Sequence, residues 1–129
     1  MLYLLDTTVL IDYLRGAPGS ERLEDVVERG DVACTTAINV EEIARGVRPK
    51  GRESATTLIQ GLVVIPLGAD EGWRAGVWRR KFAAKGKTLS QADCLVAAAA
   101  LSADAVLVTG NPRDFPMKEI TIEHWAVGR

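Results

Sequence analysis

Four acidic residues stand at positions where a carboxylate could do chemistry. Asp6 directly follows the apolar run of residues 2–5, and Glu42, Asp93 and Asp114 belong to three later segments. Carboxylates that share one crevice repel each other, so they must share protons or bind cations. Oxygen ligands without histidine or cysteine favour Mg²⁺ or Mn²⁺. One or two such ions held by carboxylates are suited to phosphodiester cleavage by metal-activated water.

Each acid also has a purely structural interpretation, which the sequence leaves open. Asp93 fits a capping box at a helix N-terminus, Asp114 fits a turn, and Glu42 fits an exposed helix face. Asp6 is the hardest to explain in this way, because Thr7 is available as the N-cap of the helix that follows.

The elements around the acids decide whether they meet. Short apolar runs alternate with longer helical stretches, which is typical of an α/β fold with a largely parallel sheet. Ligands of such sheets collect at the carboxyl ends of the strands. Asp6 and Asp114 follow strands and belong there directly. Asp93 joins them only if its helix begins at that rim, and Glu42 only if its helix turns inward.

The pattern predicts four or five strands separated by six helices. Strands are expected over residues 2–5, 32–35, 62–67, 105–109 and 119–123, the third marked as an edge strand by Pro66. Helices are expected over residues 8–15, 20–29, 36–47, 53–61, 70–84 and 91–102. The last of these helices is apolar nearly all round, so we expect it to be central and buried.

Composition limits the class of protein. The 129 residues carry a net charge of −1 and are 47% hydrophobic and 26% charged, which suits one globular domain over residues 1–129. The pI of about 5.8 gives no overall basic footprint for nucleic acid. No membrane span or signal peptide is indicated, so we expect a cytoplasmic protein. Cys34, Cys94 and the single His124 form no zinc motif, and both thiols are interpreted as buried.

Four stretches carry a resemblance to a known family. "LLDTTVLID", "EEIARG", "QADCLVAAAA" and "VTGNPRDF", in this order and over nearly the whole chain, resemble the PIN domain. More narrowly, they resemble VapC-type toxins of bacterial and archaeal toxin–antitoxin pairs. The resemblance implies a Mg²⁺- or Mn²⁺-dependent endoribonuclease on a Rossmann-like three-layer α/β/α sandwich. Such an enzyme cuts structured RNA, often tRNA or rRNA, and leaves 5′-phosphate and 3′-hydroxyl ends.

The resemblance also implies partners and site residues. A cognate VapB-like antitoxin silences the enzyme, and a homodimer assembles with it into a heterotetramer or a larger complex. Asp6, Glu42 and Asp93 match the metal ligands, and Thr7 or Thr8 orients Asp6 or a bound water.

The fourth acidic position departs from the common pattern. Many PIN domains have an acid two residues after the threonine that ends the fourth strand, here Thr109, but this chain has Asn111 at that place. The acid comes three residues later, as Asp114. It is therefore open whether Asp114 binds a metal directly, binds it through water or supports the site. Asn111 supplies a neutral oxygen or binds substrate.

Basic and aromatic residues are candidates for RNA contact. Residues 74–87 hold six cations and no acid, which on its own is also typical of a solvated helix face. The candidate RNA-binding side chains are Arg15, Arg79, Arg80, Lys85, Lys87 and Arg113. Trp73, Trp78 and Phe82 could stack on bases, but their helical spacing favours a core or a protein interface.

Two other functions remain as alternatives. A phosphatase of the haloacid-dehalogenase type also begins with a strand and an aspartate, but it needs a second acid where this chain has Thr8. A receiver-like or RNA-binding module would hold metal without turnover. A receiver, however, needs an aspartate at the end of a central strand, and the runs at 32–36 and 62–67 end in none.

Overall fold

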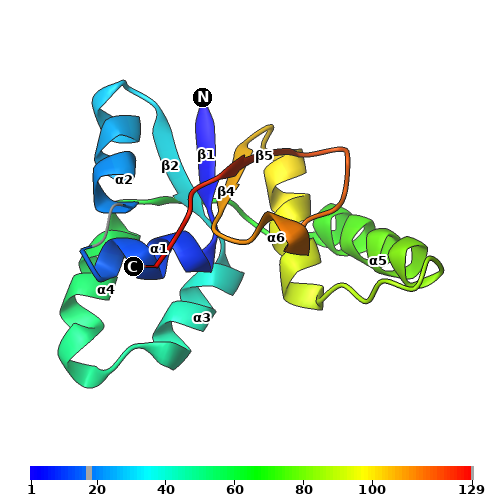
Figure 1. Ribbon diagram of the computed structural model, residues 1–129, viewed down its shortest axis with the longest axis horizontal. Coiled ribbons are helices and arrows are strands. Elements are labelled where there is room, and N and C mark those ends of the chain that lie inside the picture. Colours follow the sequence, from blue (N-terminus) through cyan, green and yellow to red (C-terminus); the bar gives the residue numbers. More distant parts are fainter. Residues whose placement is uncertain (17–18, 129) are drawn as a thin grey trace.

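Five parallel strands form the central sheet of the computed structural model, which describes residues 1–16 and 19–128 (Figure 1). They lie in the order β3-β2-β1-β4-β5. Their bounds are β1 (Leu2–Leu5), β2 (Val32–Thr35), β3 (Val63–Val64), β4 (Val106–Thr109) and β5 (Thr121–His124). The predicted parallel α/β sheet is confirmed.

Alternation along the strands divides the core into two layers. Successive side chains of a strand point to opposite faces of the sheet. Leu4 and Leu107 therefore belong to one buried cluster, whereas their neighbours Leu5 and Val108 belong to the other. Helices cover both faces, so the three-layer α/β/α sandwich is confirmed.

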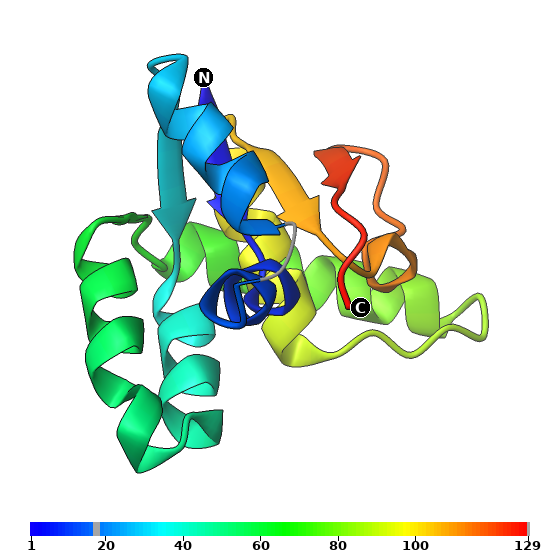
Figure 2. The same ribbon diagram turned by 60° about the vertical axis from the view of Figure 1, so that its left-hand side comes forward.

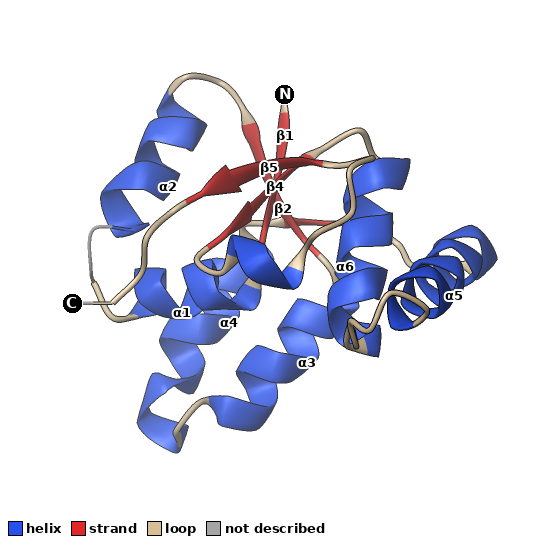
Figure 3. Cartoon of the chain, turned by 45° about the vertical axis from the view of Figure 1, so that its right-hand side comes forward, coloured by secondary structure: helices blue, strands red, loops and turns tan. Residues whose placement is uncertain are grey.

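The six helices are distributed between these faces. α5 (Ala69–Ala83) and α6 (Gln91–Ser102) lie behind the sheet in Figure 2, and α1 (Thr7–Leu14) and α2 (Gly19–Glu28) lie in front of it. α3 (Ala37–Gly46) contacts α1, α4 (Arg52–Gln60) and α6. In Figure 3 it is drawn below the strands of the sheet. α3 thus joins the helices of the two faces. Two short 3₁₀ helices, η1 (Pro49–Gly51) and η2 (Pro112–Asp114), complete the described elements.

The central helix α6 is buried as predicted. Cys94, Val96 and the four alanines 97–100 are all almost inaccessible to solvent. Their small side chains let the helix pack closely against the sheet and against α5. Cys34 is also buried, and both cysteines are free thiols, as the sequence indicated.

Chain direction brings the candidate site to one end of the sheet. From β1 the chain builds β2 and β3 on one side, then crosses to build β4 and β5 on the other. The strand order therefore reverses between β1 and β4, and ligands of open α/β sheets bind at such a switch point. Asp6 follows β1 directly, and Gly110 follows β4 at the same end.

The structure departs from the sequence prediction at the edge strands. β3 is shorter than the predicted 62–67 stretch, because Pro66 has no N–H to donate to a ladder. The Ile65 N–H still bonds to the carbonyl of Thr35 at 2.8 Å, and pairing ends there. β3 and β5 are the two edge strands.

No helix in the described ranges is both long and apolar enough to span a membrane.

Candidate active site

Asp6 lies at the centre of the candidate site and is only 8% exposed. Its Oδ1 accepts a 2.9 Å hydrogen bond from the Thr7 N–H. Its Oδ2 accepts bonds from the hydroxyls of Thr109, at 2.8 Å, and Thr8, at 3.3 Å. Asp6 is also the N-cap of α1, so assigning that role to Thr7 was wrong. The carboxylate satisfies the first turn, which leaves the Thr7 hydroxyl free for another contact.

Thr8 and Thr109 connect the ends of the two central strands. The Thr8 hydroxyl accepts a 3.0 Å bond from the Gly110 N–H, and the Thr109 hydroxyl accepts one of the same length from the Asn111 N–H. Each hydroxyl therefore accepts a hydrogen bond from a backbone N–H of the loop after β4 and donates one to Asp6. This arrangement fixes the carboxylate of Asp6 relative to the loop after β4.

Glu42 reaches the site through a second hydrogen-bond network. The Thr7 hydroxyl donates to Glu42 Oε1 at 2.6 Å and accepts from Asn39 Nδ2 at 3.0 Å. Asn39 Oδ1 in turn accepts from the hydroxyl and the N–H of Thr36. Thr36 is the N-cap of α3, and Asn39 completes its capping box. The helix cap therefore holds Glu42 beside the turn that carries Asp6.

Asp93 and Asp114 come from the other side of the sheet. Ser90 caps α6, and its Oγ accepts the Asp93 N–H at 3.0 Å. Asn111 Nδ2 donates to Asp114 Oδ2 at 2.9 Å and so positions that carboxylate. Asp93 therefore lies in the first turn of a helix, as predicted. Asn111 contacts Asp114 directly.

The charges of neighbouring acids act on Asp93 and Asp6. Burial, opposed by the Ser90 hydroxyl, raises the pKa of Asp93 to about 6, and the charges of Asp114, Asp6 and Glu42 raise it further toward that value. Burial also raises the pKa of Asp6, against hydrogen bonds from Thr109 and two neighbouring groups, and Glu42 adds to the rise. Four segments distant in sequence therefore share one field of negative charge.

The donor set suits a hard divalent cation. None of the ion pairs between described residues involves any of the four acids, so their repulsion is not offset by a basic side chain. All the available ligands are oxygens, as Mg²⁺ and Mn²⁺ prefer. Within residues 1–16 and 19–128, no three acidic, histidine or cysteine side chains form a ready metal cage. The carboxylates form a charged rim, and an ion bound there would require their side chains to move closer together.

Two of the predicted RNA-binding cations border the site through backbone contacts. Arg79 Nε donates to the carbonyl of Leu89, next to the cap of α6, at 3.3 Å. Lys87 Nζ donates to the carbonyl of Arg113, also at 3.3 Å. The basic loop after α5 is therefore tied to the turn that carries Asp114.

The remaining predicted cations are more widely spread. Arg15 lines a hollow of about 460 Å³ between α1, α3 and α4, and Glu42 lies on its wall. The Nζ atom of Lys85 lies 5.6 Å from the centre of the Phe82 ring. Arg80 is exposed on α5. Arg15 is thus close to the acidic rim, while Arg80 and Lys85 extend the basic surface along α5 and its loop.

The interpretation of the α5 aromatics as core residues is right for two of them and wrong for the third. Trp78 is buried and Phe82 is half-buried against the core. Trp73 is 80% exposed.

Sequence reasoning missed two contributors to the site. Asn39 is fully buried and links Thr36 to Thr7. Its signal was the spacing Thr-x-x-Asn, three residues before Glu42 on the same helix face. Gly110 was missed as well: a Cβ there would lie 2.7 Å from a methyl group of Val127. No local pattern in the sequence announces that close approach.

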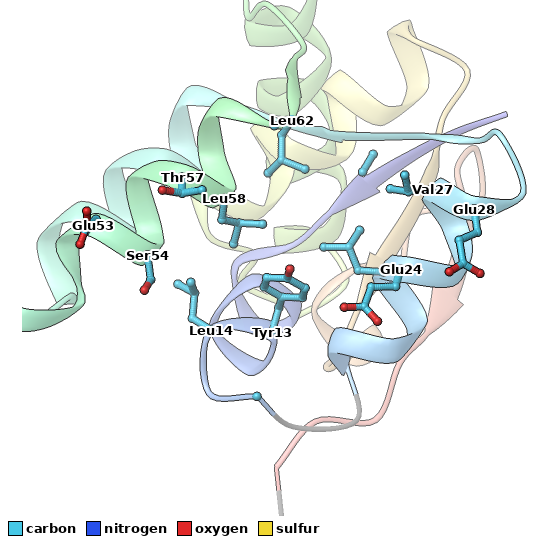
Figure 4. A pocket seen from close by; sticks show the side chains of 14 residues that line it. Tyr13, Leu14, Glu24, Val27, Glu28, Glu53, Ser54, Thr57, Leu58 and Leu62 are labelled. Carbon is cyan, nitrogen blue, oxygen red and sulfur yellow. The ribbon is translucent and has the colours of Figure 1, made fainter.

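A separate apolar groove of about 870 Å³ lies between α1, α2, α4 and β2. Figure 4 shows Leu14, Leu58 and Leu62 pointing into it, with Tyr13 between α1 and α2. Three acids line its outer parts, namely Glu24, Glu28 and Glu53. The groove thus combines an apolar floor with a negative rim.

Comparisons with known proteins agree with this geometry. Residues 3–120 match the family model of the PIN domain. The Ribonuclease VapC19 of Mycobacterium tuberculosis is 29% identical over 115 residues, which are 88% of this chain and 92% of that protein.

Solved structures show the same fold. A VapBC2 structure from Rickettsia felis, bound to a promoter DNA fragment, has a TM-score of 0.82 at 22% identity and covers 97% of this chain and 99% of its own. A DNA-bound VapBC structure from Salmonella typhimurium has a TM-score of 0.82 at 26% identity, with the same two coverages. The resemblance seen in the sequence motifs is confirmed.

Proposed function

Because this chain belongs to the PIN-domain family, we propose that it is a VapC-type toxin, a divalent-metal-dependent endoribonuclease. The observation that carries the proposal is the convergence of four acids at the switch point of the sheet, where Asp114, Asp6 and Glu42 all raise the pKa of the half-buried Asp93. Similarity to proteins named ribonucleases supports it. Since cellular RNA is the substrate, the activity belongs in the cytoplasm.

Each acid has a proposed place in the mechanism. Asp6, Glu42 and Asp93 would hold one or two Mg²⁺ or Mn²⁺ ions, and Asp114 would contribute directly or through water. A bound divalent ion lowers the pKa of water and stabilises the charge that develops on a phosphodiester. Asp6 stays oriented because three donors hold its two oxygens.

The neutral residues act by positioning the acids. Thr7 orients Glu42, and Asn111 orients Asp114. Thr8 and Thr109 keep the Asp6 carboxylate turned toward the rim. Hydrolysis by activated water needs no protein nucleophile, which agrees with an exposed His124 and buried cysteines. The expected products carry 5′-phosphate and 3′-hydroxyl ends.

Structured RNA, such as tRNA or rRNA, is the proposed substrate class. Lys87 and Arg113 border the turn of Asp114, and Arg15 borders Glu42. These cations can bind phosphates on both sides of the acidic rim. RNA affinity should therefore fall steeply with salt.

An antitoxin is the proposed regulator. The similar solved structures from Rickettsia felis and Salmonella typhimurium are VapBC assemblies. In this chain the groove of Figure 4 offers an apolar floor with Leu23 and Leu58, and Glu24, Glu28 and Glu53 surround it. Such a groove suits an amphipathic VapB-like segment that carries basic residues. A homodimer would present two such grooves to the antitoxin.

Cleavage of total RNA by the purified chain tests the proposal. Wild-type protein with Mg²⁺ or Mn²⁺ should cut RNA, and EDTA should stop it. Glu42→Gln should abolish cutting, whereas Glu41→Gln, which changes the exposed neighbour, should not. Equal activity of both variants would contradict the assignment. RNA binding without cutting would favour a non-catalytic module, and hydrolysis of small phosphomonoesters alone would favour a phosphatase.

A further inference from the structure

Trp73 is the most exposed large apolar side chain among the described residues, at 80% of its surface. The protein's other two tryptophans are buried, Trp78 at 1% and Trp125 at 6% exposure. Leaving one indole in water is unfavourable unless the ring meets a partner. Since Trp73 contributes almost nothing to the core, its side chain is available for binding.

The surroundings of Trp73 form a small hollow on α5. Gly72, Trp73, Gly76, Val77 and Arg80 line a space of about 220 Å³. The two glycines leave the backbone bare on either side of the indole, so a flat group can lie against it. Arg80 stands two helical turns further along the same face, and none of the ion pairs between described residues involves its guanidinium.

Beyond the first turn of α5, which carries Asp70 and Glu71, the charge beside this hollow is positive. Between Glu71 and Asp93 the chain has no acidic residue. Its cations in this stretch are Arg74, Arg79, Arg80, Lys81, Lys85 and Lys87. Lys87 reaches the carbonyl of Arg113 beside Asp114. A basic strip therefore runs from the Trp73 hollow to the acidic rim.

We infer that Trp73 and Arg80 form a second contact for RNA, in which an unpaired nucleobase stacks on the indole and a phosphate pairs with the guanidinium. Proteins bind unstacked bases on exposed aromatic rings beside cations, because every base has a π-face. The inference rests on the proposed ribonuclease function. It adds to the expected phosphate contact of Arg80 a base contact at Trp73, two helical turns earlier on α5. This contact would help to select RNA with an unpaired base at a fixed distance from the cut.

A second copy of this chain fits the same face poorly. A stable protein interface buries roughly 800 Å² on each partner, and the apolar part of this hollow is one indole and one valine. A polyanion with flat bases meets both the charge and the shape.

RNA binding can be measured apart from cleavage. The test uses the full chain with Asp93→Asn to prevent cutting, and the probes are unfractionated tRNA and a single-stranded oligoribonucleotide. Stacking should quench the emission of Trp73. In the Trp73→Phe form that RNA-dependent quenching should disappear, because the two remaining tryptophans are buried.

Affinity gives the second readout. Trp73→Ala should weaken RNA binding about five- to tenfold, and Trp73→Phe less, because a phenyl ring still stacks. Arg80→Ala should weaken binding and reduce the salt slope by about one. The matched controls are Val63→Ala for an exposed apolar residue on β3 and Arg52→Ala for an exposed cation on α4. Both controls should bind as the parent does.

The outcomes separate this inference from the proposed function. If wild-type protein cuts RNA but Trp73→Ala binds and cuts equally well, the stacking contact is overturned and the ribonuclease stands. If wild-type protein cuts no RNA, the proposed function fails, while quenching of Trp73 by RNA would still support the contact. If Trp73→Ala changes the molecular mass in light scattering without changing RNA affinity, the face is a protein interface and the inference is wrong.

Discussion

The Thr109 hydroxyl donates a 2.8 Å hydrogen bond to Oδ2 of Asp6, across 103 positions of sequence. Both residues are buried, and they stand at the ends of adjacent central strands. The bond lowers the pKa of Asp6 against the effect of burial. It therefore links the stability of the sheet to the charge of the central carboxylate.

Thr109→Val removes this bond while nearly keeping the side-chain volume. We expect a loss of about 1–2 kcal/mol in the free energy of unfolding, because a buried acceptor loses a donor. The pKa of Asp6 should rise, so divalent ions should bind more weakly near neutral pH. Urea unfolding and Mn²⁺ titration measure the two effects. Thr109→Ser keeps the hydroxyl and should restore both, and a valine variant that binds Mn²⁺ normally would contradict the role of Thr109.

The raised pKa of Asp93 predicts that the stability of the metal-free protein depends on pH. The folded protein holds its proton up to about pH 6, whereas the ordinary value is 3.8. The native state then binds more protons than the unfolded state, so stability should fall as pH rises from about 4 to 6. The expected loss is on the order of 1 kcal/mol, since the side chain is half-buried and water screens it.

The comparison that isolates Asp93 uses Asp93→Asn. Thermal unfolding in EDTA from pH 4 to 7.5 should show the wild type losing stability relative to this variant as pH rises. Adding Mg²⁺ should reverse that trend for the wild type, since the ion favours the charged carboxylate. Parallel curves for the two proteins in EDTA would show that Asp93 is not under this repulsion.

Asn39 connects the cap of α3 to Glu42 through Thr7. Asn39→Ala should lower the free energy of unfolding by about 1–3 kcal/mol, since buried groups of Thr36 and Thr7 lose a partner. It should also lower the rate of RNA cleavage, because Glu42 loses its fixed hydroxyl donor. Thr7→Val removes that donor and the acceptor of Asn39 Nδ2, but it leaves the cap of Thr36 and Asn39 in place.

Cleavage rates per folded molecule, with folding checked by circular dichroism, separate the two effects. Asn39→Ala and Thr7→Val should share the loss of activity, while Asn39→Ala should have the larger loss of stability. If Thr7→Val cuts RNA at the wild-type rate, Glu42 does not need this bond.

Gly110 should not tolerate a side chain. The Cβ of Gly110→Ala would lie 2.7 and 2.8 Å from two methyl carbons of Val127 and 3.3 Å from the Thr8 hydroxyl. We expect a loss of about 1–3 kcal/mol in stability from this overpacking. Val127→Ala in the same chain should recover part of that loss. If the second change recovers nothing, the contact with Val127 is not the cause.

Local patterns were sufficient to predict most of the elements and to select the acids that lie at the carboxyl end of the sheet. Period-2 and period-3.6 spacing placed the strands and helices, and the parallel order follows from their alternation. Asp6 and Asp114 were placed correctly because each follows a strand. The networks around them could not be predicted in the same way, since Thr109 and Thr8 meet Asp6 and Gly110 through contacts between β1 and β4. Trp73 and Trp78 differ by five positions, and only the packing of α5 on α6 decides which one is buried.

The separation of Asp6 from Thr109 and Asp114 along the chain has a consequence during synthesis. On the ribosome, Asp6 is added 103 residues before Thr109 and 108 residues before Asp114. The acidic rim is therefore incomplete until Asp114 has been added to the nascent polypeptide. If the rim cuts RNA, the growing chain is harmless to the ribosome that makes it.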